Sequence, residues 1–324
     1  MALPKFAFLD GRILPYSDAK VGLLTHALNY GTGCFAGIRA YWSADENELF
    51  VFRPHDHFVR FLESSRLLAM QVPFSAEDLA GRLVELLRKE GLREDCYIRP
   101  LAFLSEETIG VRLHGLKSSV SIVAFPFGKY LDRPEGAHLT ISSWRRIDDN
   151  VIPPRGKITG GYANSALAKT DAQNAGFDDA ILLDSQGKVS EATVSNVFLV
   201  RRGEVVTPRT TDSVLEGITR RTVAALVERE LGRPVVERAI DRTELFLAEE
   251  VFLAGTGVEI IPVTRVDHRP VGSGVPGPIT EQIRRIFFDA VRGKTPRYRS
   301  WCEPVYARPA AAVEASPALE AVRG

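Results

Sequence analysis

Cysteine is scarce in this chain of 324 residues, which contains only Cys34, Cys96 and Cys302. An odd number of cysteines without a CxxC pair argues against a disulfide framework and against a structural zinc site. The N-terminal residues also lack a basic stretch that leads into an apolar run, so we expect no secretory signal peptide. Together these absences predict a protein of the reducing cytoplasm.

The chain also lacks an excess of charge of either sign and any long hydrophobic run. Its 41 Lys and Arg residues balance 41 Asp and Glu residues, so the formal net charge is zero. Nucleic-acid binding through bulk charge needs a basic surplus, and a transmembrane helix needs about 18 consecutive apolar residues. We therefore expect neither a nucleic-acid partner nor a membrane partner.

Lysine is rare as well, because the basic residues comprise 9 Lys and 32 Arg. An arginine cannot replace a lysine as a nucleophilic amine, since its guanidinium stays protonated and forms no Schiff base. Any chemistry that needs a free amine therefore has few candidate residues.

The length suits two compact domains rather than one core. Strand-like segments and helical periodicities occur in both halves, with helices expected from about Pro54, from Ser75, and over 219–231 and 279–291. We predict an α+β fold. Its expected parts are a smaller N-terminal domain (1–128), a connection (129–140), a larger C-terminal domain (141–303) and a flexible tail (304–324).

Two short patterns resemble common binding motifs but stand in the wrong context. Residues 272–277 read G-x-G-x-x-G, yet a polar segment precedes them where a dinucleotide site needs a buried strand. His55 and His57 flank Asp56 near a helix start, where such residues are more often caps and surface groups than metal ligands. We expect neither a dinucleotide site nor a metal.

Four other segments suggest a reactive amine beside a phosphate site. A glycine-rich segment contains Lys157, with Tyr162 five positions on. By itself it would be an ordinary surface loop. Glu191, however, stands just before a strand that we expect to be buried. Gly217–Thr219 opens a helix and Gly255–Thr256 lies in a turn, and both offer free backbone N–H groups of the kind that bind phosphate.

In chain order, these segments resemble the branched-chain amino-acid aminotransferases, which are fold-type IV enzymes dependent on pyridoxal 5'-phosphate (PLP). The resemblance extends from Phe8 to about Pro304. The stretches that carry it are His26–Gly33, Gly37–Arg39, Tyr97–Leu101, Phe125–Gly128, Ser142–Trp144, and those around Lys157, Glu191, Gly217 and Gly255. It implies two α+β domains with PLP in the cleft between them.

The resemblance also implies the roles of the cofactor-binding residues. Lys157 would carry the cofactor and, once a substrate amine has displaced it, act as the base that moves the α-proton. Tyr162 would hydrogen-bond the phenolic oxygen of PLP, Glu191 would keep its pyridine nitrogen protonated, and Arg60 would bind the phosphate. The other expected phosphate contacts are Gly217, Ile218, Thr219 and Thr256.

For the substrates, the resemblance implies transamination of leucine, isoleucine and valine with 2-oxoglutarate by a ping-pong mechanism, giving branched 2-oxo acids and L-glutamate. Tyr97 and the Thr256–Gly257 turn match contacts to the α-carboxylate. Arg99, Tyr130 and Tyr30 of the partner subunit match contacts to the distal carboxylate of glutamate, so we expect at least a homodimer. The remaining expected substrate-pocket residues are Phe35, Gly37, Arg39 and Phe127.

Three positions depart from the family pattern around the expected substrate pocket. Ala36 stands where many members have glutamate, Phe127 replaces a common tryptophan, and Gly257 replaces a common alanine. The loop at 111–116 also matches poorly. These departures bear on the preference for the substrate side chain and not on the cofactor chemistry.

Several alternatives remain open. Lys157 and Glu191 would serve equally in a D-amino-acid aminotransferase, an (R)-amine transaminase or an aminodeoxychorismate lyase; Tyr97–Arg99 and Gly37–Arg39 favour the branched-chain group. An inactive PLP-binding scaffold would be expected to have lost the lysine or the glutamate. A dehydrogenase would depend on the glycine pattern already set aside.

Overall fold

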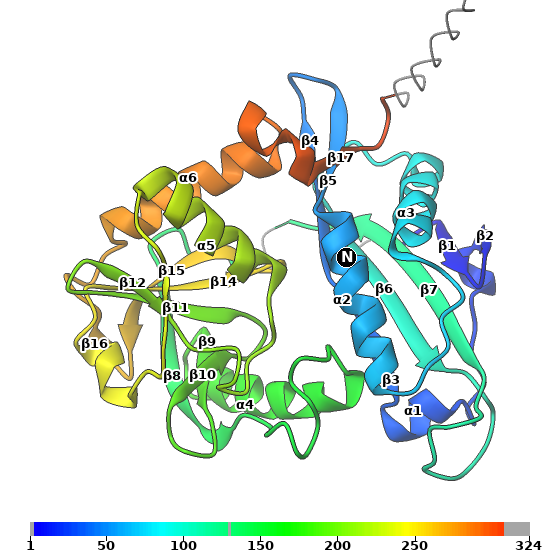
Figure 1. Ribbon diagram of the computed structural model, residues 1–324, viewed down its shortest axis with the longest axis horizontal. Coiled ribbons are helices and arrows are strands. Elements are labelled where there is room, and N and C mark those ends of the chain that lie inside the picture. The colour runs from blue at the N-terminus through cyan, green and yellow to red at the C-terminus, as the bar shows by residue number, and fades with distance from the viewer. Residues whose placement is uncertain (1–2, 129–130, 308–324) are drawn as a thin grey trace, which may run out of the picture.

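The computed structural model describes residues 3–128 and 131–307. Two sheets with helices packed on them lie side by side, with the N-terminal sheet on the right of Figure 1. The predicted α+β class is confirmed. Within these residues, no helix is long and apolar enough to span a membrane.

The first sheet has eight strands in the order β17-β5-β4-β6-β7-β1-β2, with β3 also paired to β6. All of its pairings are antiparallel. Helices α2 and α3 pack on this sheet. The elements are β1 (Phe6–Leu9), β2 (Arg12–Pro15), α1 (His26–Tyr30), β3 (Gly33–Phe35), β4 (Ile38–Ser43), β5 (Glu48–Phe52), α2 (Pro54–Leu67), α3 (Ala76–Glu90), β6 (Cys96–Leu104), β7 (Ser118–Pro126) and β17 (Cys302–Pro304).

The second sheet has nine strands in the order β10-β9-β8-β15-β14-β11-β12-β13, with β16 on β15. An additional pairing of β10 with β11 closes six of them into a ring. Helix α4 packs on β8 and β9, whereas α5 and α6 pack near β14. The elements are β8 (Ala137–Arg145), α4 (Tyr162–Asn174), β9 (Asp179–Leu183), β10 (Val189–Ala192), β11 (Asn196–Arg201), β12 (Glu204–Thr207), α5 (Ile218–Leu231), β13 (Val236–Glu237), β14 (Glu250–Gly255), β15 (Glu259–Val266), β16 (Arg269–Pro270) and α6 (Pro278–Val291).

Local sequence explains where several helices begin. Ser75 caps α3 through a capping box with Asp78, in which each side chain accepts a hydrogen bond from the other residue's backbone N–H. At α6, the carboxylate of Glu250 accepts from the N–H groups of Ile279 and Thr280. The glycine pattern at 272–277 therefore leads into a helix end that is already occupied by a carboxylate.

A hydrophobic cluster joins the two sheets. Tyr41 and Phe52 of the first sheet pack with Phe252 of the second and with Val223 and Phe287 from the two helices beside it. The change from one sheet to the other occurs between Pro126 and Ala137. The exact domain boundaries placed around residues 129–140 stay a prediction.

One sequence expectation needs correction, and one helix was not predicted. The start of the expected tail is part of the fold, because β17 pairs with β5 and Val305 is completely buried. Helix α4 was not predicted, since its apolar residues do not gather on one face and give no helical periodicity.

Candidate active site

A cavity of about 670 Å³ is lined by residues from both sheets. Most of the residues predicted for the site line it together. They are Phe35, Gly37, Arg60, Tyr97, Arg99, Phe127, Lys157, Tyr162, Glu191, Gly217, Ile218, Thr219, Thr256 and Gly257. Segments up to about 220 residues apart in sequence thus meet at one place.

Lys157 is tied by its backbone to the first sheet. Its carbonyl accepts from the N–H of Phe35 at 3.0 Å, and its own N–H donates to the Ser64 hydroxyl at 3.1 Å. The side-chain amine donates to the Tyr162 hydroxyl at 2.5 Å. Burial, reinforced by the nearby charge of Arg60, lowers the pKa of Lys157 to about 7. The amine is therefore available in its neutral, nucleophilic form near neutral pH.

Tyr162 is the first residue of α4 and lies against Phe35, with the ring centroids 4.6 Å apart. Burial raises the pKa of its phenol, and the nearby Glu191 carboxylate raises it further. The phenol consequently keeps its proton and can donate a hydrogen bond into the cavity.

Glu191 has partners that the sequence analysis did not identify. Arg146 forms an ion pair with its carboxylate at 2.9 Å, and the Asn196 amide and the Leu215 N–H each donate to it at 3.1 Å. Burial raises the pKa of Glu191, while Arg146 and the Leu215 N–H oppose that shift. Arg146 follows the Ser142–Trp144 stretch closely, which was its only sequence signal.

Another part of the cavity wall, beside the start of α5, is suited to an anion. Arg60 on α2 is buried, and it donates to the Glu216 carbonyl at 3.0 Å, just before α5 begins. Burial lowers the pKa of Arg60 to about 10, so it remains a cation at neutral pH. The first N–H groups of α5, at Ile218 and Thr219, have no acceptor within the helix. A Cβ on Gly217 would lie 2.1 Å from the Asn196 amide oxygen, so this approach requires glycine.

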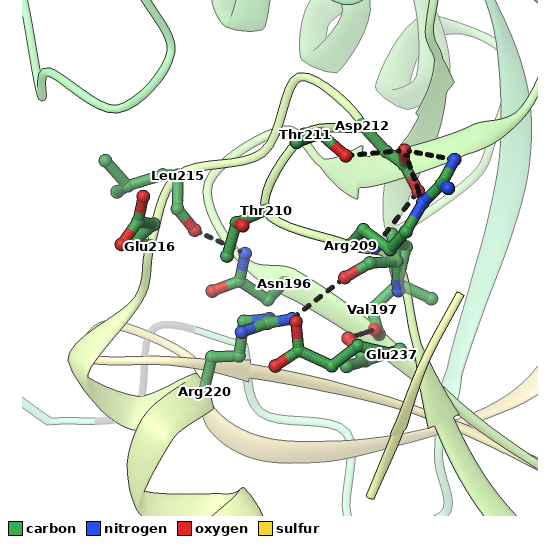
Figure 2. A network of polar contacts seen from close by, with 12 residues as sticks. Asn196, Val197, Arg209, Thr210, Thr211, Asp212, Leu215, Glu216, Arg220 and Glu237 are labelled. Carbon is green, nitrogen blue, oxygen red and sulfur yellow. Dashed lines mark hydrogen bonds and ion pairs between the residues drawn. The ribbon is translucent and has the colours of Figure 1, made fainter. Parts of the chain in front are cut away.

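Figure 2 shows how the segment that leads into α5 is held. The Asn196 amide donates to the Leu215 carbonyl at 2.9 Å. Arg220, in the first turn of α5, donates to the Pro208 carbonyl at 2.9 Å and pairs with Glu237 at 3.0 Å. The helix start is thereby fixed to the second sheet, with its N–H groups directed by the fold and not by a flexible loop.

These residues fit PLP. The cavity supplies a buried neutral amine, a carboxylate fixed by Arg146, and an arginine beside a helix start for the phosphate. Among the described residues, the buried Ser195 hydroxyl in the lining also has no hydrogen-bond partner, although such groups are normally satisfied. A polar ligand in the cavity is the simplest way to satisfy it.

The other part of the cavity combines aromatic rings with a cation. The Arg99 guanidinium lies 4.4 Å from the ring centroid of Phe35 and donates to the Tyr97 hydroxyl at 3.2 Å. Phe125 and Phe127 lie beside Tyr97. Arg99 forms no ion pair with any residue in the described part of the chain, so its charge is available to a ligand.

Three of the residues predicted for the site are not part of the described cavity lining. Arg39 is buried outside the lining, where it forms an ion pair with Glu259 at 2.6 Å. Tyr30 is also outside it, and its hydroxyl accepts from the Gly110 N–H at 3.1 Å. Tyr130 lies outside the described residues.

Comparison with known proteins identifies the family. The family model described as amino-transferase class IV matches residues 33–266. A probable branched-chain-amino-acid aminotransferase of Aquifex aeolicus is 46% identical, over 93% of this chain and 97% of the relative.

Solved structures of aminotransferases are similar to this chain over most of its length. A branched-chain aminotransferase from Thermoproteus uzoniensis, crystallised with norvaline, has a TM-score of 0.90 and 43% identity, over 94% of this chain and 100% of that one. The PLP form of a branched-chain amino acid aminotransferase from Thermobaculum terrenum has a TM-score of 0.89 and 39% identity, over 94% and 99%.

Proposed function

Since the chain belongs to the class IV aminotransferases, in the group of branched-chain-amino-acid aminotransferases, we propose that it transfers the amino group of leucine, isoleucine or valine to 2-oxoglutarate. The observation that carries this proposal is the buried Lys157 amine, whose pKa burial lowers to about 7, in one cavity with Tyr162 and the Arg146–Glu191 pair. The products are the branched 2-oxo acid and L-glutamate.

PLP, when bound, supplies an electron sink for the negative charge that develops at the substrate's α-carbon. Glu191, fixed by Arg146, would hold a proton on the ring nitrogen, and the Tyr162 phenol would donate to the ring's phenolic oxygen. Arg60, Thr256 and the start of α5 hold the phosphate. The amine of Lys157, which burial keeps partly neutral near pH 7, would take the proton from the substrate's α-carbon and deliver it to the cofactor carbon that receives the amino group.

The substrate part of the cavity suits two kinds of side chain in turn. Phe35, Phe125 and Phe127 give an apolar surface for a branched hydrocarbon. Arg99, which forms no ion pair with any of the described residues, binds the distal carboxylate of glutamate or 2-oxoglutarate. Tyr97 and the Thr256–Gly257 turn hold the α-carboxylate that every substrate carries.

The active form in this proposal is at least a homodimer. Tyr30 lies beside a surface where the segments 21–30 and 105–111 meet, through the N–H of Thr108 to the Leu24 carbonyl and of Gly110 to the Tyr30 hydroxyl. Several large apolar side chains are exposed there: Val21, Leu23, Leu24, Leu28, Ile109 and Val111. A second copy of the chain would bury them and bring Tyr30 to the neighbouring cavity.

A cytoplasmic location belongs to the same proposal. Its support is that all three cysteines are buried free thiols, a state that a reducing compartment maintains.

The first test is the absorption spectrum of the purified protein. We expect a yellow protein whose visible band is lost on addition of L-leucine and restored by 2-oxoglutarate. Lys157→Ala should abolish turnover, because no other lysine of the described residues lines the cavity. Wild-type turnover in Lys157→Ala would contradict the proposal. Loss of the band with D-alanine or (R)-1-phenylethylamine, but not with L-leucine, would instead identify a different transaminase of this fold.

A further inference from the structure

Arg39 and Glu259 connect the two sheets beside the cavity. Arg39 lies on β4 of the first sheet and Glu259 begins β15 of the second. Their side chains are 4% and 11% exposed, and the guanidinium Nη1 lies 2.6 Å from the carboxylate Oε1. An ion pair this deeply buried holds its partners firmly, because separating them would leave an unpaired charge in the interior.

On the side of the second sheet, Glu259 fixes a turn of the cavity wall. It pairs with Gly255 across β14 and β15, so Thr256 and Gly257 lie within the turn that this pair closes. Glu259 itself has a φ of +59°, a left-handed conformation that is uncommon for a residue with a side chain. The ion pair compensates for this backbone strain and thereby sets the place of the turn.

On the side of the first sheet, the same guanidinium holds the aromatic wall. Its Nη2 donates to the carbonyl of Phe127 at 3.4 Å and to that of Gly128. The guanidinium carbon lies 5.3 Å from the centroid of the Phe127 ring, which lines the cavity. Arg39 is also the strand partner of Tyr97. The Arg39 side chain therefore contacts both Glu259, which closes the turn, and the Phe127–Gly128 backbone, which carries the aromatic wall.

Direct binding of a substrate by Arg39 does not fit these contacts. Arg39 is absent from the cavity lining, and its charge is neutralised by Glu259. The neighbouring Tyr41 does not alter this balance, because burial and the Glu259 carboxylate raise the pKa of its phenol well above the ordinary value. To reach a substrate carboxylate, Arg39 would have to leave Glu259 unpaired in the interior.

We infer that Arg39 and Glu259 are a positioning pair, which sets the spacing between Phe127 and the Thr256–Gly257 turn and so determines how tightly the α-carboxylate is held. The inference rests on the proposed function, in which that turn contacts the α-carboxylate. It assigns Arg39 a role that is exerted through other residues and not by contact with the substrate.

The decisive variant is Glu259→Gln, which keeps the shape of the side chain and removes its charge. We expect KM for L-leucine and KM for 2-oxoglutarate to rise by the same factor, about tenfold, because both substrates carry an α-carboxylate and a small displacement of a binding group weakens both contacts. The kcat at saturation and the visible band of the bound cofactor should stay near the wild-type values.

Two further variants make the result decisive. Arg39→Gln/Glu259→Gln removes both charges, so it leaves none unpaired in the interior, and it should raise both KM values as Glu259→Gln does. Arg292→Lys weakens another ion pair, with Asp95 at 2.7 Å, which is about one-third exposed and lies outside the cavity lining, and it should leave both KM values unchanged.

Two outcomes would overturn the inference. Unchanged KM values in both Glu259 variants would mean that the pair only stabilises the fold. A KM increase in Arg39→Gln/Glu259→Gln without one in Glu259→Gln would mean that Arg39 contacts the substrate itself. The wild-type reaction in the same assay tests the proposed function independently, because the inference concerns only the ratio of variant KM to wild-type KM.

Discussion

At the scale of single residues, the charges that line the cavity explain which ligands it attracts and why the pKa of its lysine is lowered. Among the described residues of the lining, the cations Arg60, Arg99, Arg146 and Lys157 face one carboxylate, that of Glu191. This surplus of positive charge in a buried site attracts phosphate and carboxylate groups. It also opposes protonation of Lys157, whose pKa falls to about 7 chiefly through burial and then through Arg60. The groups that bind the anions therefore also help to keep the amine neutral.

The lowered pKa of Lys157 predicts how stability depends on pH in the cofactor-free protein. The ordinary value of 10.5 applies to the unfolded chain and about 7 to the folded one. Between these values the unfolded chain binds a proton that the folded protein does not, so this residue makes the free energy of unfolding rise with pH. Melting temperatures measured from pH 7 to 9.5 should show this rise, and Lys157→Met should reduce it.

The exposed Lys117 provides the control for that measurement. Lys117→Met changes the same residue type at the surface and should leave the pH dependence as it is in the wild type. An unchanged slope in Lys157→Met would show that Lys157 is protonated to the same extent in both states.

The proposed role of Arg99 predicts that its substitution affects the two half-reactions differently. Arg99→Leu removes a cation that contacts only the distal carboxylate in the proposed function, so kcat/KM for 2-oxoglutarate should fall roughly ten- to a hundredfold, since a charge-assisted hydrogen bond is worth about 1.5–3 kcal/mol. The leucine half-reaction, followed in single turnover by the loss of the visible band, should change little.

Tyr97→Phe is the matched comparison for Arg99, because Tyr97 is expected to contact the α-carboxylate of both substrates. It should weaken both half-reactions together. Equal damage to the two half-reactions by Arg99→Leu would mean that Arg99 holds the α-carboxylate and that the substrate lies in the opposite orientation.

At the level of secondary-structure elements, the ends of helices and strands are held by buried carboxylates. Glu48 on β5 accepts hydrogen bonds from the backbone N–H groups of Val305, Tyr306 and Ala307 at 2.7–3.0 Å. These residues follow β17, so one side chain holds the segment to the first sheet. The Glu250 carboxylate holds the start of α6 in the same way, by accepting from backbone N–H groups of its first turn.

Glu48→Gln should lower the free energy of unfolding by about 1–3 kcal/mol, because buried N–H groups lose a charged acceptor. Chemical denaturation measures this loss. Glu46→Gln is the control: Glu46 is an exposed partner of Arg299, and surface ion pairs contribute about 0–1 kcal/mol. Equal stability of the two variants would show that Glu48 does not hold the segment.

At the scale of the whole molecule, the exposed apolar residues beside Tyr30 predict assembly. Leu23 and Ile109 are 83% and 68% exposed, in segments that lie side by side through the Thr108–Leu24 hydrogen bond. Leu23→Asp/Ile109→Asp would place two charges in the proposed interface. We expect light scattering to show a shift to monomer, with loss of most activity.

Val275→Asp serves as the control for assembly, because Val275 is 61% exposed but lies near the start of α6, far in sequence from this surface. It should leave the oligomeric state and the activity unchanged. A wild-type protein that is monomeric and fully active at the assay concentration would refute the proposed dimer.

The sequence by itself determined the elements and the class of the protein. Helical spacing and turn residues are local signals, so α2, α3, α5 and α6 were predicted close to their observed bounds. The motifs around Lys157 and Glu191 likewise indicated the family, because each motif consists of a few consecutive residues and can be recognised without the fold. Helix α4 was missed since it carries no such periodicity.

The tertiary structure alone decided which distant side chains meet. Arg146 lies 45 positions before Glu191 in the sequence, and only the pairing of strands brings their charges to 2.9 Å. Arg39 belongs to a recognisable motif, yet its ion pair with Glu259 keeps it outside the cavity. The physical reason is that a buried charge takes whichever opposite charge the fold brings to it, and sequence spacing carries no information about a partner from another sheet.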